Sequence, residues 1–335
     1  MKINNIKFAV IPALLVILAV SALISLSIGG SKIPLADVMR ALFHGSSPDM
    51  VSTIIWKIRV PRVMLGIFVG MGLASAGCVF QGLLRNPLAD PYTLGISGGA
   101  AFGATLATVT GLAAVTIFSL PFSAFLGSLA CFYSVYFIAS RKSFSVNSLI
   151  LTGVIFGFIF SSAVLLILAL SSPGKIQSSL IWLTGDLSSP NTPLIMLVSL
   201  IVLFGFAVLF IFSRELNILV LGEEKALTLG VNTDKTKKII FITASLLTGA
   251  CVSVSGIIGF VGLLIPHLMR KATGPDHRLL LPASALGGAA FLPLCDSLAR
   301  SVIAPVELPV GVITGLAGGI FFLVFLLRSD SNKVF

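Results

Sequence analysis

Long apolar runs separated by short polar loops constrain the fold of this chain more than any other feature. Only 10% of the 335 residues are charged, whereas soluble domains carry roughly a quarter. A bilayer core is crossed by about 20 apolar residues in a helix, and inside it every backbone polar group needs an internal partner. We therefore expect an all-α polytopic membrane protein with about ten transmembrane helices, forming one membrane domain over residues 1–335. The expected spans cover residues 8–28, 63–84, 92–110, 120–139, 145–170, 192–212, 239–255, 257–269, 279–298 and 308–327.

The basic residues set the expected orientation of these spans. Lys and Arg number 22 against 12 acidic residues, but they lie in short loops, a pattern that directs membrane topology rather than nucleic-acid binding. Placing the basic loops inside puts both termini in the cytoplasm, including a tail that begins at Arg328 and a loop that carries Arg141 and Lys142. Residues 29–58 become an outer loop, with a short interfacial helix over 33–43 that starts at Pro34.

Four basic residues depart from this bias, because they lie at the expected outer ends of spans. They are Lys57, Arg59, Arg62 and Arg300. Charge alone leaves two interpretations open, which are contact with lipid headgroups and contact with an acidic partner. The four cysteines and three histidines are scattered without metal-ligand spacing, so we expect neither a disulfide framework nor a metal site.

Small residues recur every fourth position in three expected spans. These stripes comprise Gly95, Gly99 and Gly103; Gly153, Gly157 and Ser161; and Gly311, Gly315 and Gly319. Small residues at this spacing allow helix backbones to approach closely, so ordinary helix packing is the simpler interpretation. The alternative is that some of these helices line a path through the membrane.

The expected spans lack the groups that power transport within one chain. No Asp, Glu, Lys or Arg lies near the middle of a span, which weakens the hypothesis of an ion-coupled secondary transporter acting alone. The dipeptide Gly174-Lys175 is followed by Ile176 and lacks the earlier glycine of a phosphate-binding loop. Energy for uphill transport would have to enter from another protein through a cytoplasmic contact.

Residues 213–238 are the longest charged interruption of the chain and the best candidate for that contact. They hold nine of the 34 charged side chains. Gly222 can open a short helix, with Glu223 and Glu224 in its first turn, and Gly230 can end it. A helix of about seven residues is unstable alone in water, so it has to pack on its own bundle or in a partner's groove; a solvated loop is the remaining alternative.

Several motifs occur in order over residues 55–328. They are Arg59-Val60-Pro61-Arg62, Arg85-Asn86-Pro87-Leu88-Ala89-Asp90-Pro91, Trp182-Leu183-Thr184-Gly185, Leu221-Gly222-Glu223, Gly259-Phe260-Val261-Gly262-Leu263 and Glu307-Leu308-Pro309-Val310-Gly311. In this pattern the chain resembles the FecCD family, the membrane permeases of ABC importers for iron-siderophores, haem and vitamin B12. Gly318-Gly319-Ile320 departs from the Gly-Ala-Pro that family members often carry, so we expect glycine flexibility in place of a helix kink there.

The resemblance implies a fold and a set of partners. The fold is that of vitamin-B12-importer permeases, and the chain is a transport subunit rather than an enzyme. It pairs with a second permease subunit, a homodimer being the expected form, and with two cytoplasmic ATPase chains that bind ATP and Mg. An extracytoplasmic substrate-binding protein delivers a ferric siderophore, haem or cobalamin. The expected location is the cytoplasmic membrane of a bacterium or archaeon, with membrane lipid as the surrounding partner and no nucleic acid.

The resemblance also implies roles for individual residues. Contact with the ATPase is expected at Leu216, Leu221, Gly222, Glu223, Ala226, Leu229 and Gly230. The arginines Arg59, Arg62 and Arg300 are expected to face outward and meet carboxylates of the binding protein, which favours the acidic partner left open above. The helices that carry Gly153, Gly157, Gly311 and Gly315 are expected to line the path.

Overall fold

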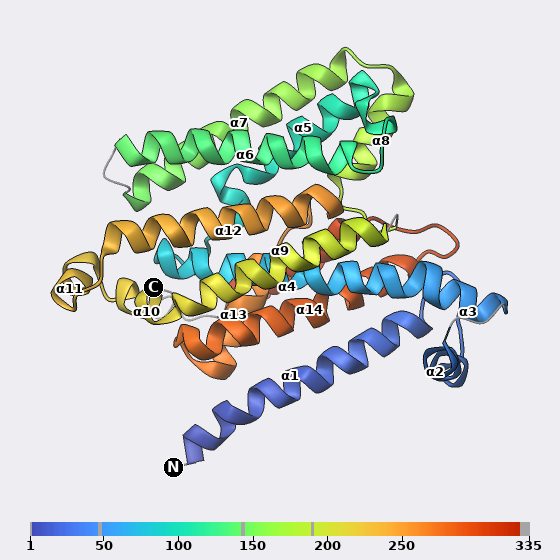
Figure 1. The fold of residues 1–335 in the computed structure, drawn as a ribbon, viewed down its shortest axis with the longest axis horizontal. Helices are drawn as coiled ribbons and strands as arrows, with labels where there is room; N and C mark the ends of the chain where they lie inside the picture. The colour runs from blue at the N-terminus through green and yellow to red at the C-terminus, as the bar shows by residue number, and fades with distance from the viewer. Residues whose placement is uncertain (1, 46–48, 142–144, 189–190, 329–335) are drawn as a thin grey trace.

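The protein is a bundle of helices, seen in the computed structural model in Figure 1. The structure describes residues 2–45, 49–141, 145–188 and 191–328, and within these ranges all regular structure is helical. The long helices are α1 (Lys2–Ser27), α4 (Val60–Leu83), α5 (Ile96–Thr110), α6 (Ser119–Arg141), α7 (Val146–Ala169), α9 (Thr192–Ile211), α12 (Thr233–Ser255), α13 (Val261–Thr273), α14 (His277–Ser301) and α15 (Val310–Arg328). The short ones are α2 (Leu35–His44), α3 (Met50–Ile54), the π-helix η1 (Ile55–Arg59), the 3₁₀ helices η2 (Pro91–Leu94) and η3 (Leu112–Ala114), α8 (Pro173–Leu183), α10 (Ser213–Val220) and α11 (Glu223–Thr228).

Seven helical segments of the described chain are long and apolar enough to cross a membrane, which makes this a multi-pass membrane protein. They confirm seven of the expected spans. The apolar helix α5, the apolar part of α15 over Val310–Phe325 and the 13-residue α13 fall below that length. At about 1.5 Å per residue α13 is about 20 Å long, short of a bilayer core of about 30 Å. Lys142 and the expected tail after Arg328 lie outside the described residues.

Helix α4 lies at the centre of the bundle. It packs most extensively on α14, and also on α12, α13 and α9, while α5, α6 and α7 form a second group beside α12 (Figure 1). The backbones of α4 and α14 touch directly, because a side chain at Gly70 would overlap the carbonyl of Gly288, and one at Gly288 would overlap the carbonyl of Gly70. Glycine therefore sets the separation of the two most extensively paired helices.

The two ends of the bundle can be named by their short helices. The α10 end, at the left of Figure 1, carries α10, α11 and the start of α1, whereas the α2 end, at the right, carries α2, α3 and α8. The short helix expected over 33–43 is present as α2, with Pro34 at its start as the N-cap. The expected loop around it was wrong in part, because residues 50–59 are helical and continue into α4. Helix α8 was not expected at all.

Two segments break inside the bundle where unbroken spans were expected. The expected helix from Tyr92 divides into η2 and α5 at Gly95, which adopts a left-handed conformation. Residues 256–260 run irregularly between α12 and α13. The Tyr92 hydroxyl joins the breaks by donating to the Ile258 carbonyl at 2.8 Å and accepting from the Ile258 amide at 3.2 Å. Backbone groups freed by the irregular turn thus find internal partners, as a membrane interior requires.

Candidate functional site

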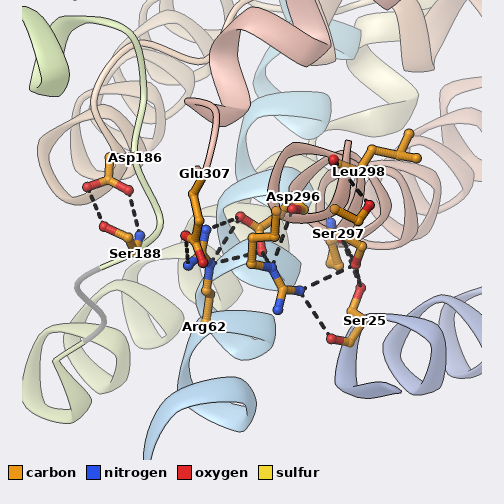
Figure 2. Close-up of polar contacts among 11 residues, drawn as sticks. Ser25, Arg62, Asp186, Ser188, Asp296, Ser297, Leu298 and Glu307 are labelled. Carbon is orange, nitrogen blue, oxygen red and sulfur yellow. Dashed lines mark hydrogen bonds and ion pairs between the residues drawn. The ribbon is translucent and has the colours of Figure 1, made fainter. Parts of the chain in front are cut away.

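A cluster of charged side chains fills the α2 end, where α1, α4 and α14 meet (Figure 2). Arg62, near the start of α4, forms a forked ion pair with Asp296 of α14, its Nε and Nη2 atoms donating at 2.9 to 3.1 Å. Its Nη1 atom donates to Glu307 at 2.8 Å. Arg300 approaches the other side of Asp296, with Nε 3.0 Å from Oδ2. One carboxylate therefore holds two guanidinium groups.

Arg59 and Arg300 also bind the end of α1. Arg59 donates to the carbonyl oxygens of Leu26 and Ser31, and Arg300 Nη2 donates to the Ser25 carbonyl at 3.1 Å. These contacts order the turn that leads from α1 into α2. The cluster contains three arginines and two carboxylates, so it keeps one formal positive charge (3 − 2 = 1).

The structure brings together the three arginines predicted to dock a partner, but it does not leave them exposed. Arg59, Arg62 and Arg300 are 4%, 6% and 4% exposed. Their side chains are already bound within the chain, Arg62 and Arg300 by carboxylates and Arg59 by the carbonyls at the end of α1. Of the four basic residues predicted at outer span ends, only Lys57 is exposed. Docking to a partner stays a prediction.

At the α10 end, the chain forms two short helices, α10 and α11, and the second is the helix expected between Gly222 and Gly230. Leu216 and Leu219 are buried on the bundle side of α10, and Ala226 is fully buried on α11. Gly222 and Gly230 have φ angles of 123° and 80° and mark the bounds of α11. A buried Lys237 of α12 pairs with Glu223 at 3.0 Å and so holds the first turn of α11.

The predicted coupling residues divide into two groups. Leu221 and Leu229 are 60% and 61% exposed, so their apolar side chains are available to a partner. Leu216 and Ala226 face the protein's own bundle instead, so their side chains are not available for direct contact with a partner. The sequence alone could not distinguish the exposed face from the buried face, because the ends of these short, uncapped helices could not be located closely enough to assign helical spacing.

The four predicted path glycines occupy different surroundings. Gly153 and Gly157 of α7 line a pocket of about 580 Å³ between α5, α7 and α8, together with Gly95 and Ser161. A side chain at Gly311 of α15 would overlap the Thr184 carbonyl, whereas one at Gly315 would meet nothing within 4 Å. The structure thus places Gly153 and Gly157 at one cavity, Gly311 at a close helix contact and Gly315 on an open face.

Sequence reasoning overlooked Asn217, whose side chain joins α10 to the start of α14. Its amide nitrogen donates to Asp276 at 2.7 Å, and its amide oxygen accepts from the His277 backbone at 2.9 Å. No sequence motif indicates that an Asn on a short helix contacts a residue 60 positions further along the chain. The described residues contain no group of three or more His, Cys, Asp or Glu side chains that could hold a metal ion.

Comparison with known proteins places this arrangement of helices in a family. The FecCD transport family matches residues 17–328. The chain belongs to the FecCD transport family. It is 45% identical to an uncharacterized ABC transporter permease protein of Bacillus subtilis, over 93% of this chain and 91% of that protein. It is 38% identical to the hemin transport system permease protein of Yersinia pestis, over 96% of each chain.

A second relative and a solved structure agree with this placement. The cobalamin import system permease protein of Halobacterium salinarum is 43% identical over 84% of this chain and 75% of its own length. The solved structure is an inward-facing conformation of an ABC transporter assigned to the metal-chelate type. It matches with a TM-score of 0.83 and 33% identity, over 96% of this chain and all of that one. The family resemblance inferred from the motifs is confirmed.

Proposed function

We propose that this FecCD-family chain is the membrane-spanning permease subunit of a binding-protein-dependent ABC importer. Its cargo is a ferric siderophore or haem, with cobalamin as the next candidate. The observation that carries the proposal is the family match over residues 17–328, with relatives named for hemin and cobalamin import. The chain itself binds no cofactor and is no enzyme; a separate ATPase chain binds ATP and Mg and hydrolyses the nucleotide.

The proposed topology has ten spans in one membrane domain, with both termini on the cytoplasmic side of a bacterial or archaeal cytoplasmic membrane. The α10 end is then cytoplasmic. Support comes from charge, because Arg85, Arg214, Lys235 and Arg270 all lie in or beside the α10 end. The shortness of α13 is accommodated by residues 256–260, which run irregularly, with Gly256 and Ile258 buried and the other three half-buried.

Energy enters through residues 216–230 in this proposal. Exposed Leu221 and Leu229 insert into an apolar groove of the ATPase, while buried Leu216 and Ala226 fix the two short helices to the bundle. Closure of two ATPase chains on ATP draws the α10–α11 segments of two permease subunits together, and rigid-body movement of each subunit then alternates access across the membrane. A homodimer is the simplest such pair.

The path for cargo lies between the two subunits, beside α7 and α15. Both helices present broad apolar faces that the rest of this chain leaves uncovered, including Phe158, Leu165, Leu316 and Ile320 at 60% exposure or more. Such faces suit either a second subunit or membrane lipid. The pocket lined by Gly153 and Gly157 opens on the same side of α7.

The binding protein docks on the α2 end. The charge cluster of Arg59, Arg62 and Arg300 supports this because it keeps one positive charge after internal pairing, and exposed Lys32 and Lys57 lie beside it. Exposed pairs contribute only about 0.2–1 kcal/mol each, so these charges would orient an acidic partner more than fasten it.

The test is transport by the reconstituted complex. The chain, its cognate ATPase and its cognate binding protein are placed in proteoliposomes with radiolabelled ferric hydroxamate, hemin or cobalamin outside. ATP-dependent uptake that needs all three proteins is expected for at least one cargo. Uptake by this chain alone on an ion gradient would instead establish a secondary transporter and overturn the proposal.

A further inference from the structure

Helix α10 is attached to the bundle by hydrogen bonds as well as by apolar packing. The Asn217 side chain uses both of its polar atoms, donating to Asp276 at 2.7 Å and accepting from the His277 backbone amide at 2.9 Å. Its oxygen also lies 2.7 Å from the His277 Nδ1 atom. Because that oxygen can only accept, the ring proton is on Nδ1. Three contacts from one side chain hold α10 to the N-terminus of α14.

A second attachment joins α10 to the end of α4. Arg85, directly after α4, donates from Nε to the Leu219 carbonyl at 3.1 Å, and it adopts a positive φ of 48°. A non-glycine residue in this left-handed region is uncommon, and it aims the guanidinium back at α10. The buried His277 ring fills the space between the helices, since a side chain at Gly82 of α4 would meet the His277 Nε2 atom at 2.7 Å.

The helices held at this junction are the same two that carry the charge cluster at the opposite end. Helix α4 carries Arg62 near its start and Gly82 near its end, and α14 carries His277 at its start and Asp296 and Arg300 near its end. The pair is locked at its far end by the Arg62–Asp296 ion pair and near its middle by the Gly70–Gly288 contact. At about 1.5 Å per residue, the 24 residues of α4 span about 36 Å. Both ends of the molecule are thus parts of one pair of helices.

We propose that Asn217 is a positioning residue that fixes α10 to the α4–α14 pair, so that a displacement of α10 moves both helices as one body. The inference rests on the proposed function, in which an ATPase moves α10. Packing of Leu216 and Leu219 alone would let the short helix tilt or slide, because apolar contacts are not directional. The hydrogen bonds of Asn217 fix its register against α14.

The test measures a distance within one chain, so it does not depend on the second subunit. Spin labels are attached to the variants Lys57→Cys, just before α4, and Arg214→Cys, on α10 itself, both at exposed positions near the two ends. The four native cysteines are buried and stay unlabelled. With Asn217 present, we expect a narrow distance distribution that stays within about 2 Å when the complex passes from the nucleotide-free state to the ATP–vanadate state, a shift below the positional spread of ordered side chains.

Substitution of Asn217 should loosen this attachment in a graded way. Asn217→Ala removes all three contacts, so the distribution should broaden at least twofold even without the ATPase, and with ATP–vanadate it should shift. Asn217→Asp sets a second carboxylate against Asp276 and should broaden it further. Asn217→Asp with Asp276→Asn removes the facing carboxylates and lets the new amide at position 276 donate to the new carboxylate at position 217, so the distribution should be narrower than for Asn217→Asp alone. The Arg278 backbone amide, which shares the Asp276 Oδ1 atom with Asn217, loses its acceptor in this variant.

Asn232→Ala is the matched control, because it removes the N-cap bond to the Lys235 amide at the start of α12 without touching α14. It should lower thermal stability less than Asn217→Ala, because it removes one exposed hydrogen bond rather than three part-buried contacts, and it should leave the label distance narrow. ATP hydrolysis is measured on the same samples, and Asn217→Ala should keep it while losing at least half of the ATP-driven transport.

Three outcomes would overturn the inference. The first is a wild-type label distance that shifts with ATP–vanadate. The second is a distance distribution for Asn217→Ala that is as narrow as that of the Asn232→Ala control. The third is a distribution for the double variant Asn217→Asp with Asp276→Asn that is no narrower than that of Asn217→Asp alone. Failure of wild-type transport would count against the proposed function alone, since the label distances without the ATPase still report on the junction.

Discussion

Removing the carboxylate of Asp296 should destabilise the protein more than any other single change in the charge cluster. Asp296 holds Arg62 by a forked ion pair and Arg300 at 3.0 Å, and all three side chains are at most 7% exposed. Asp296→Asn leaves Arg300 without a carboxylate and Arg62 with only Glu307. Breaking a buried ion pair from one side typically costs about 3–5 kcal/mol, because the remaining charge stays buried without compensation.

The neighbouring carboxylate provides a matched control. Glu307 makes one contact, to Arg62 at 2.8 Å, and its side chain is 41% exposed. Glu307→Gln should therefore cost only about 0.2–1 kcal/mol, the range of solvent-exposed pairs. Both substitutions convert a carboxylate to an amide of the same shape and change the net charge equally. Any difference between them reports burial and the number of arginines held.

The free energy of unfolding can be followed by titration from a mild detergent into dodecyl sulfate, with the fluorescence of Trp56 and Trp182 as the signal. Asp296→Asn should lower the free energy of unfolding by several kcal/mol more than Glu307→Gln does. Equal losses of less than about 1 kcal/mol would show that water reaches both guanidinium groups. The arginines would then be accessible in the free protein, as the sequence had suggested.

Two further predictions concern packing and the coupling helices. Gly70→Ala should lower the free energy of unfolding by at least about 1–3 kcal/mol, since its methyl group would overlap a backbone carbonyl. Gly315→Ala should leave the free energy of unfolding unchanged, because open space surrounds that position. The same detergent titration measures both variants. Leu221→Asp should abolish most ATPase binding in a pull-down without changing thermal stability, because the side chain is exposed, and Ala226→Leu should lower thermal stability because that site is fully buried. Binding that survives Leu221→Asp, or stability that survives Ala226→Leu, would contradict the assignment of the two faces.

The sequence predicted helices well where a long apolar run fixed both their length and their surroundings. The helices α6, α7 and α9 begin and end within two residues of the expected bounds. Prediction was weaker where backbone geometry depends on another segment. The break at Gly95 and the irregular residues 256–260 support each other through Tyr92, so neither half indicates the interruption by itself.

Burial of the arginines could not be predicted for the same reason. The charge pattern correctly singled out Arg59, Arg62 and Arg300 as unusual for outer span ends, but Arg62 pairs with Asp296 across 234 positions of sequence. The sequence does not show that α4 packs on α14, so it cannot distinguish an exposed arginine from a buried arginine that is paired with a carboxylate. Exposed Lys57 and buried Arg59 are only two residues apart.

The distribution of contacts indicates which helices can move. The α4–α14 pair is held by ion pairs at one end, by touching glycine backbones in the middle and by the Asn217 junction at the other. By contrast, α15 packs only on α14 and α13 among the stronger contacts of the described helices. Among the same contacts, helix α7 packs on α5 and α6 along one face but not on the α4–α14 pair, and most of its apolar length is uncovered, since just 17% of that window is buried. Weakly packed elements open at lower free energy than densely packed ones. A displacement at α10 should therefore rotate the α4–α14 pair without deforming it, and α7 and α15 should make the local adjustments that open and close a path.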